Sequence, residues 1–140
     1  MRDAFKYLTS LLFAAVVVQV ALAGYGAFYA VDKSDDNGSI SKDAVEHGFN
    51  AHAVLGTIIV VVMLLLLVVA AAGRLGRPWL PWAGGIFLLG ILQMLLAWLG
   101  DAVAALGFLH AVNALVIYAA VALLAHRAWR SRGASAAAPA

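Results

Sequence analysis

Four apolar stretches, each long enough to cross a lipid bilayer, dominate this sequence and leave little room for any other fold. They cover approximately residues 8–30, 50–72, 79–100 and 105–126. Each reaches the ~20 residues that an α-helix needs to cross a hydrocarbon core about 30 Å thick. Only 11% of the residues are charged, whereas soluble domains contain about 25%. We therefore predict an all-α membrane protein, an antiparallel bundle of four transmembrane helices.

The stretches belong to one domain, residues 1–130, followed by a small polar tail at 131–140 that we expect to be disordered. Residues 31–49 form the predicted external loop, in which Asn37-Gly38-Ser39 is a turn signal. Ser41 or Asp43 is placed to cap a short helix that runs into the second span. Pro78 suits the first position of the third span.

The charges divide between the two ends of the predicted bundle. One end carries seven basic residues and one acidic residue: Arg2, Lys6, Arg74, Arg77, Arg127, Arg130, Arg132 and Asp3. The other end carries two basic and six acidic residues: Lys33, Lys42, Asp32, Asp35, Asp36, Asp43, Glu46 and Asp101. The positive-inside rule then predicts a multi-pass protein of the bacterial plasma membrane with both termini in the cytoplasm. The basic residues thus report topology, and we expect no binding to nucleic acid.

The first stretch also resembles a secretory signal, because Ala21-Leu22-Ala23 follows a basic start and an apolar run. The apolar run continues to Ala30, so we favour a retained helix. The chain contains no cysteine. Disulfides, iron–sulfur clusters, covalently attached haem and thiolate ligation are therefore excluded.

The order of a glutamine helix followed by a histidine helix occurs twice. Gln19 in the first span precedes His52 in the second, and Gln93 in the third precedes His110 in the fourth. Both units would cross the membrane in the same sense, as parallel repeats do. This recurrence predicts an internal duplication of a two-helix unit.

The two histidines stand in matching settings, Ala51-His52-Ala53-Val54 and Leu109-His110-Ala111-Val112. An ionisable side chain near hydrocarbon depth is costly and marks a candidate functional site. At ~1.5 Å per residue, His52 lies about 13 Å and His110 about 9 Å outside the midplane, on the external side. We expect the two rings to meet diagonally across the bundle as axial ligands of one haem b per protomer, in the outer leaflet.

Two other interpretations of these histidines stay open. A histidine near a helix end is often hydrogen-bonded between helices or placed at the interface, without any cofactor. A bare copper or zinc ion held by His47, His52 and His110, with Glu46, is the other alternative. His47 otherwise belongs with water, haem propionates or an entry site, and His126 is expected at the opposite membrane face.

Polar and small residues near the histidines complete the candidate site. Gln19, Gln93 and Asn113 are expected to hydrogen-bond between helices. Either glutamine could accept the second N–H of a ligating imidazole, and Asn113 could orient the ring of His110. Gly56, four residues after His52, could leave room for a macrocycle.

The stretches from Gln19 to Phe28, from His47 to Gly56 and from Leu109 to Leu115 resemble an uncharacterised, largely actinobacterial family of four-helix membrane proteins. The arrangement is also similar to one four-helix half of haem A synthase. That resemblance implies outer-side histidine ligands on the second and fourth helices, here His52 and His110.

These patterns lead to a functional hypothesis in which the chain is a membrane b-type haem protein. Its role would be electron exchange with quinol or another redox partner, or the handling or sensing of haem. The alternative is a membrane subunit or scaffold without a cofactor. Small residues on several helices are compatible with a homo-oligomer or a larger complex and indicate no interface.

Overall fold

The computed structural model describes residues 1–76 and 79–131, and every regular element in these ranges is an α-helix. The helices are α1 (Arg2–Asp32), α2 (Lys42–Ala72), α3 (Trp79–Gly100) and α4 (Ala104–Arg130). All four are long and apolar enough to cross a membrane. The predicted all-α class with four spans is confirmed. Pro78 and the tail at 132–140 lie outside the described residues.

The helices extend further than the apolar stretches at the loop between α1 and α2. The α2 helix begins at Lys42 rather than near Asn50, because Ser41 caps it and accepts a hydrogen bond from the Ala44 amide at 3.1 Å. Lys42 and Glu46 then form an i,i+4 ion pair. The connecting loop is therefore shorter than the predicted external loop at 31–49.

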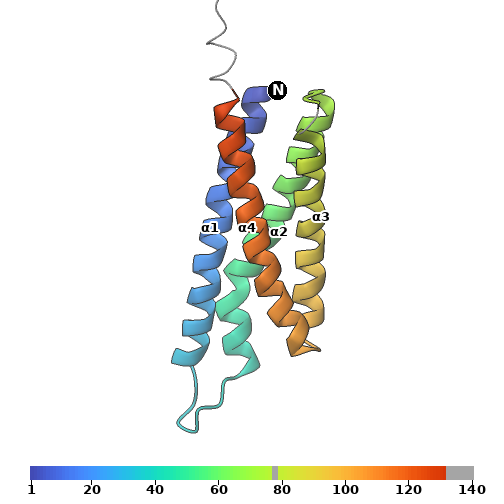
Figure 1. The fold of residues 1–140 in the computed structure, drawn as a ribbon. Helices are drawn as coiled ribbons and strands as arrows, with labels where there is room; N and C mark the ends of the chain where they lie inside the picture. Colours follow the sequence, from blue (N-terminus) through green and yellow to red (C-terminus); the bar gives the residue numbers. More distant parts are fainter. Residues whose placement is uncertain (77–78, 132–140) are drawn as a thin grey trace, which may run out of the picture.

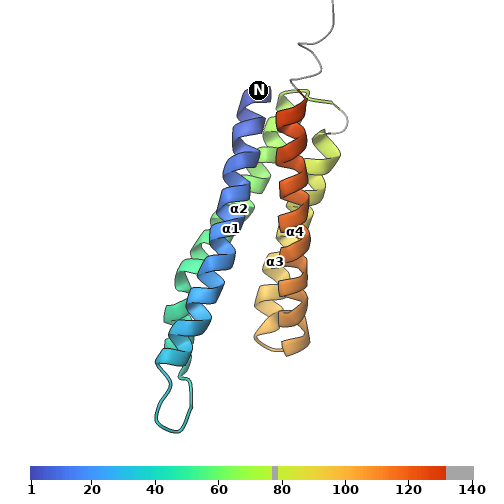
Figure 2. The ribbon, with the colours of Figure 1, turned by 60° about the vertical axis from the view of Figure 1, so that its left-hand side comes forward.

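Neighbouring helices run antiparallel around the bundle in the order α1, α2, α3, α4, so α2 and α4 lie on a diagonal. Both Met1 and the end of α4 lie at one end, at the top of Figure 1, while the α1–α2 loop and the α3–α4 turn lie at the other. We call these the basic end and the acidic end, after the charges that they carry. Figure 2 shows that the α1/α2 and α3/α4 pairs diverge toward the acidic end.

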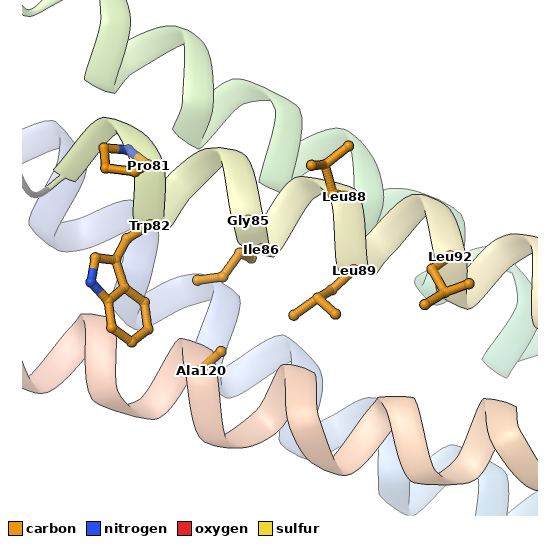
Figure 3. A pocket seen from close by; sticks show the side chains of 8 residues that line it. All are labelled: Pro81, Trp82, Gly85, Ile86, Leu88, Leu89, Leu92 and Ala120. Carbon is orange, nitrogen blue, oxygen red and sulfur yellow. The ribbon is translucent and has the colours of Figure 1, made fainter.

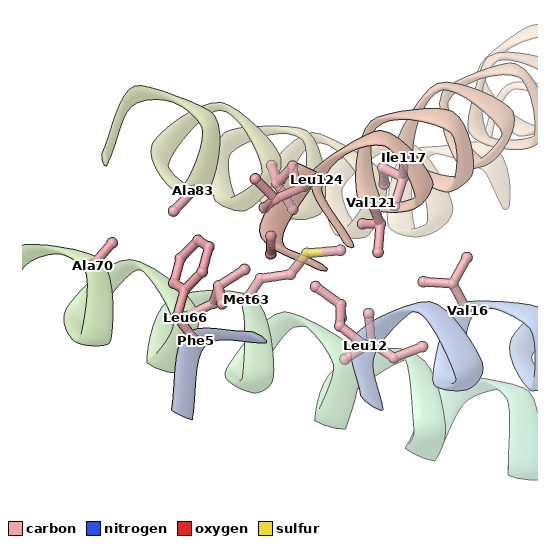
Figure 4. Close-up of a cluster of buried hydrophobic side chains, with 13 residues drawn as sticks. Phe5, Leu12, Val16, Met63, Leu66, Ala70, Ala83, Ile117, Val121 and Leu124 are labelled. Carbon is pink, nitrogen blue, oxygen red and sulfur yellow. The ribbon is translucent and has the colours of Figure 1, made fainter. Parts of the chain in front are cut away.

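The main apolar cluster lies in the half of the bundle near the basic end, whereas the buried residues Ala30, Ala44 and Leu96 lie outside it, nearer the acidic end. Side chains from all four helices meet in this cluster around Met63, Leu66 and Leu124, which are almost completely buried (Figure 4). The contributing segments are 5–16 of α1, 59–70 of α2, 83–86 of α3 and 117–128 of α4. Because this cluster ties the two helix pairs together at one end, the pairs are free to separate at the other.

A close glycine crossing holds α1 against α2 in the half near the acidic end. A Cβ added at Gly26 would lie 2.9 Å from the carbonyl oxygen of Gly48 and 2.9 Å from ring atoms of Phe49. A Cβ added at Gly48 would lie 2.7 Å from the carbonyl oxygen of Gly26. The two helices approach each other this closely because neither residue has a side chain.

We predict that Gly26→Ala lowers the free energy of unfolding by about 1–3 kcal/mol, because the added methyl group overpacks a backbone contact. Gly24→Ala is the matched control, since a Cβ at Gly24 meets nothing within 4 Å. Unfolding of the detergent-solubilised protein, followed by circular dichroism, measures both changes. Equal stability of the two variants would contradict the crossing.

Candidate functional site

The rings of His52 and His110 face each other across the diagonal of the bundle. Their centroids are 6.3 Å apart and their planes are inclined by 60°. His52 lies in the first third of α2 and His110 in the first turns of α4, so both approach from the acidic end. The structure thus brings together the two histidines that the sequence analysis paired, in the half of the bundle that lacks the main apolar cluster.

Each histidine is oriented by a backbone carbonyl of the preceding helix. Nδ1 of His52 lies 3.1 Å from the carbonyl oxygen of Gln19, and Nδ1 of His110 lies 3.1 Å from that of Gln93. A carbonyl oxygen only accepts, so Nδ1 of each neutral ring carries the proton and donates it. In both rings Nε2 is then left with a lone pair, which is the form of imidazole that binds metal ions.

A network of side-chain hydrogen bonds joins α3 to α4. The side-chain amide of Asn113 donates to Oε1 of Gln93 at 2.7 Å and to the carbonyl oxygen of Leu89 at 3.0 Å. Nε2 of Gln93 lies 3.1 Å from Nε2 of His110 and donates to it. Asn113 therefore lies on the same network as the His110 ring and acts on it through the Gln93 amide, without a direct contact.

The equivalent network between α1 and α2 is incomplete. Nε2 of Gln19 donates to the carbonyl oxygen of His52 at 2.8 Å, but its buried Oε1 has no hydrogen-bond partner in the described part of the chain. Leu55 is three residues after His52, the position that Asn113 occupies after His110, and its side chain has no donor. An unpaired buried acceptor costs about 1–3 kcal/mol, so this oxygen marks a place that favours a donor.

Gly56 packs against the side chain of Gln19 instead of bordering an open space. A Cβ at Gly56 would lie 3.0 Å from Nε2 of Gln19. The small residue that we expected to leave room for a macrocycle therefore leaves room for the glutamine. Phe49 packs edge-on against the His52 ring, with centroids 6.0 Å apart, and no sequence pattern predicted this contact.

His47 does not join the other two histidines. Its ring pairs with Asp43, with Nδ1 3.8 Å from Oδ1, and most of its side chain is exposed. Residues 1–76 and 79–131 contain no group of three or more histidine, aspartate or glutamate side chains placed to hold a metal ion. The bare copper or zinc site that included His47 and Glu46 is therefore not assembled. His126 is exposed, as expected for an interfacial side chain.

A groove between α3 and α4 has a volume of about 600 Å³ and is lined almost entirely by apolar side chains (Figure 3). Apart from the Trp82 indole, its walls are aliphatic, from Pro81 to Leu92 on α3 with Ala120 on α4. The indole lies under the guanidinium of Arg127, 4.8 Å from the ring centroid. The groove contains neither histidine, so the polar site is separate from it.

Four apolar helices joined by hydrogen bonds of Gln19, Gln93 and Asn113 define a multi-pass helical membrane protein. A model described as a family of unknown function (DUF6220) matches residues 19–102, and the chain belongs to this family. The matched region contains Gln19, His52 and Gln93, and it ends before His110. Comparison with curated proteins and with solved structures gave no match.

We predict that Asn113→Leu lowers the free energy of unfolding by about 1 kcal/mol, because it leaves Oε1 of Gln93 without its donor. Thr57→Val is the control, since the Thr57 hydroxyl bonds only within its own helix, to the carbonyl of Ala53. The two variants are compared by chemical unfolding in detergent micelles. An Asn113→Leu protein as stable as Thr57→Val would show that the network adds no stability.

Proposed function

We propose that this chain is a membrane b-type haem protein in which His52 and His110 are the axial ligands of a single haem. The observation that carries the proposal is the spacing of the two rings. Imidazole nitrogens lie about 2.0–2.1 Å from a metal ion that they bind, so two rings on opposite sides of one ion have centroids roughly 6 Å apart. The observed separation is 6.3 Å.

The donor set suits haem better than a bare ion. Two protein nitrogens are too few for a closed zinc site, which takes four protein ligands. A haem needs only axial ligands from the protein. The carbonyl bonds to Nδ1 also match the outer contacts that usually fix a ligating histidine. Finally, the half of the bundle around the rings lacks the packed apolar cluster that fills the other half.

In this proposal, other residues of the chain position the two imidazole rings. The carbonyl oxygens of Gln19 and Gln93 accept the Nδ1 protons, which leaves Nε2 of each ring with a lone pair that can bind a metal ion. The Gln93 amide, which now donates to Nε2 of His110, would turn toward another acceptor. When bound, the haem would supply single-electron exchange between ferric and ferrous iron, with quinol or another redox partner at the acidic end. Handling or sensing of haem would use the same ligands.

One observation favours a second candidate, a membrane subunit or scaffold without a cofactor. Nε2 of His110 already accepts a hydrogen bond from Gln93, and Asn113 satisfies the other end of that amide. This is the arrangement expected of polar residues that join helices. In that case the histidines would only hold α1 to α2 and α3 to α4.

We expect the protein, purified in detergent and supplied with haem, to bind one haem per chain and to show a Soret band that shifts on reduction with dithionite. His52→Ala and His110→Ala should each remove the bis-histidine spectrum, because each takes away one axial nitrogen. His47→Ala and His126→Ala are matched controls that should leave it unchanged. A reconstituted protein without the band would favour the scaffold, and a band unaffected by the first two variants would refute the ligand assignment.

We also propose that the basic end faces the cytoplasm of a bacterial cell and the acidic end faces outward, following the positive-inside rule. The natural sequence has no cysteine, so single-cysteine variants report on one site each. In intact cells, a membrane-impermeant maleimide should label Ser39→Cys in the α1–α2 loop. It should label Ser131→Cys, after α4, only once the membrane is opened. The reverse pattern would invert the topology.

A further inference from the structure

A cavity at the basic end brings together two cations that the haem proposal does not use. It has a volume of about 230 Å³, several times the ~30 Å³ that one water molecule occupies in the liquid. Five of its lining residues come from helices α1, α3 and α4, and the other two from the turn after α2 and the C-cap of α4: Arg2, Phe5, Lys6, Leu75, Trp79, Ala128 and Ser131. Among the described residues, the walls contain two cations and a hydroxyl but no carboxylate.

Lys6 is the unusual member of this set, because it is only 5% exposed. A lysine is rarely buried so completely unless a partner compensates its charge. Its Nζ lies 3.9 Å from the ring centroid of Trp129 and 4.8 Å from that of Tyr7. The aromatic rings stabilise the ammonium only in part, since a cation–π contact contributes about 0.5–2 kcal/mol.

The surrounding contacts hold Lys6 in this position. The Trp129 indole donates to the Ser10 hydroxyl at 2.9 Å, which fixes the ring next to α1. The Thr9 hydroxyl donates to the Lys6 carbonyl oxygen at 2.7 Å. The lysine is thus kept at the cavity by α1 and α4 together. Asp3 lies on the same turn of α1 but is not part of the lining.

We propose that this cavity binds a phosphate group, with Lys6 and Arg2 as its cationic ligands. Basic pockets between helices at a membrane surface suit anionic lipid headgroups. The cavity lies at the ends of three spans, with Trp79 in its wall and Trp129 beside it, where aromatic belts meet lipid headgroups. An anionic phospholipid is therefore the expected source of the phosphate, and a soluble phosphate is the other.

Titration of the detergent-solubilised protein with phosphatidylglycerol, followed by tryptophan fluorescence, tests this site. Phosphatidylcholine of the same chain length and inorganic phosphate form the other two arms. We expect phosphatidylglycerol to bind more tightly than phosphatidylcholine. Lys6→Gln should weaken its binding about tenfold, the loss expected for one charge-assisted hydrogen bond.

Arg2→Gln is the second variant, because Arg2 is exposed and its replacement disturbs no buried contact. Arg130→Gln removes one charge from the same end without touching the cavity and should bind as the natural protein does. If inorganic phosphate displaces the lipid, the phosphate site is supported and its ligand is a soluble anion rather than a phospholipid. Equal affinity for both lipids, or equal affinity in all three variants, would overturn the proposal. Neither outcome depends on haem, because His52 and His110 are unchanged.

Discussion

The hydrogen bond from an imidazole Nδ1 to a backbone carbonyl is the interaction on which the polar half of this bundle depends. It occurs once in each helix pair, from His52 to Gln19 and from His110 to Gln93. An alanine follows four residues after each glutamine, Ala23 and Ala97, where a longer side chain would cover the carbonyl. Small side chains at these positions let a ring reach a carbonyl oxygen that already takes part in helix hydrogen bonding.

The packed apolar cluster and the hydrogen-bonded polar side chains lie in opposite halves of the bundle. The half near the basic end contains the packed apolar cluster, which joins all four helices. The half near the acidic end relies on the Gly26–Gly48 crossing within one pair and on side-chain hydrogen bonds within each pair. Because the diverging pairs have few buried apolar contacts there, binding between them would disturb little of the packing that stabilises the fold.

The sequence predicted the four spans, the diagonal placement of α2 and α4, and the approach of His52 and His110 from one end. Those features follow from apolar length, helix direction and rise per residue. It named Gln19 and Gln93 as acceptors for the imidazole N–H groups, but it did not specify that their backbone carbonyls would be used or that Gly56 would pack on Gln19. These contacts depend on how each helix is rotated about its axis, and hydropathy does not specify that rotation. Lys6 was not predicted as a site residue, because its positive charge was already explained by the positive-inside rule.

The two histidines share one environment at Nδ1 and differ at Nε2. In His110 this nitrogen accepts from Gln93, which Asn113 holds in place from the other side. In His52 no such bond is present among the described residues, and the neighbouring Gln19 keeps an unpaired oxygen because Leu55 stands where the other pair has asparagine. The α3/α4 pair is thus a closed network and the α1/α2 pair an open one. A ligand between the pairs would find an uncommitted nitrogen on α2, but it would have to compete with an amide for the nitrogen on α4.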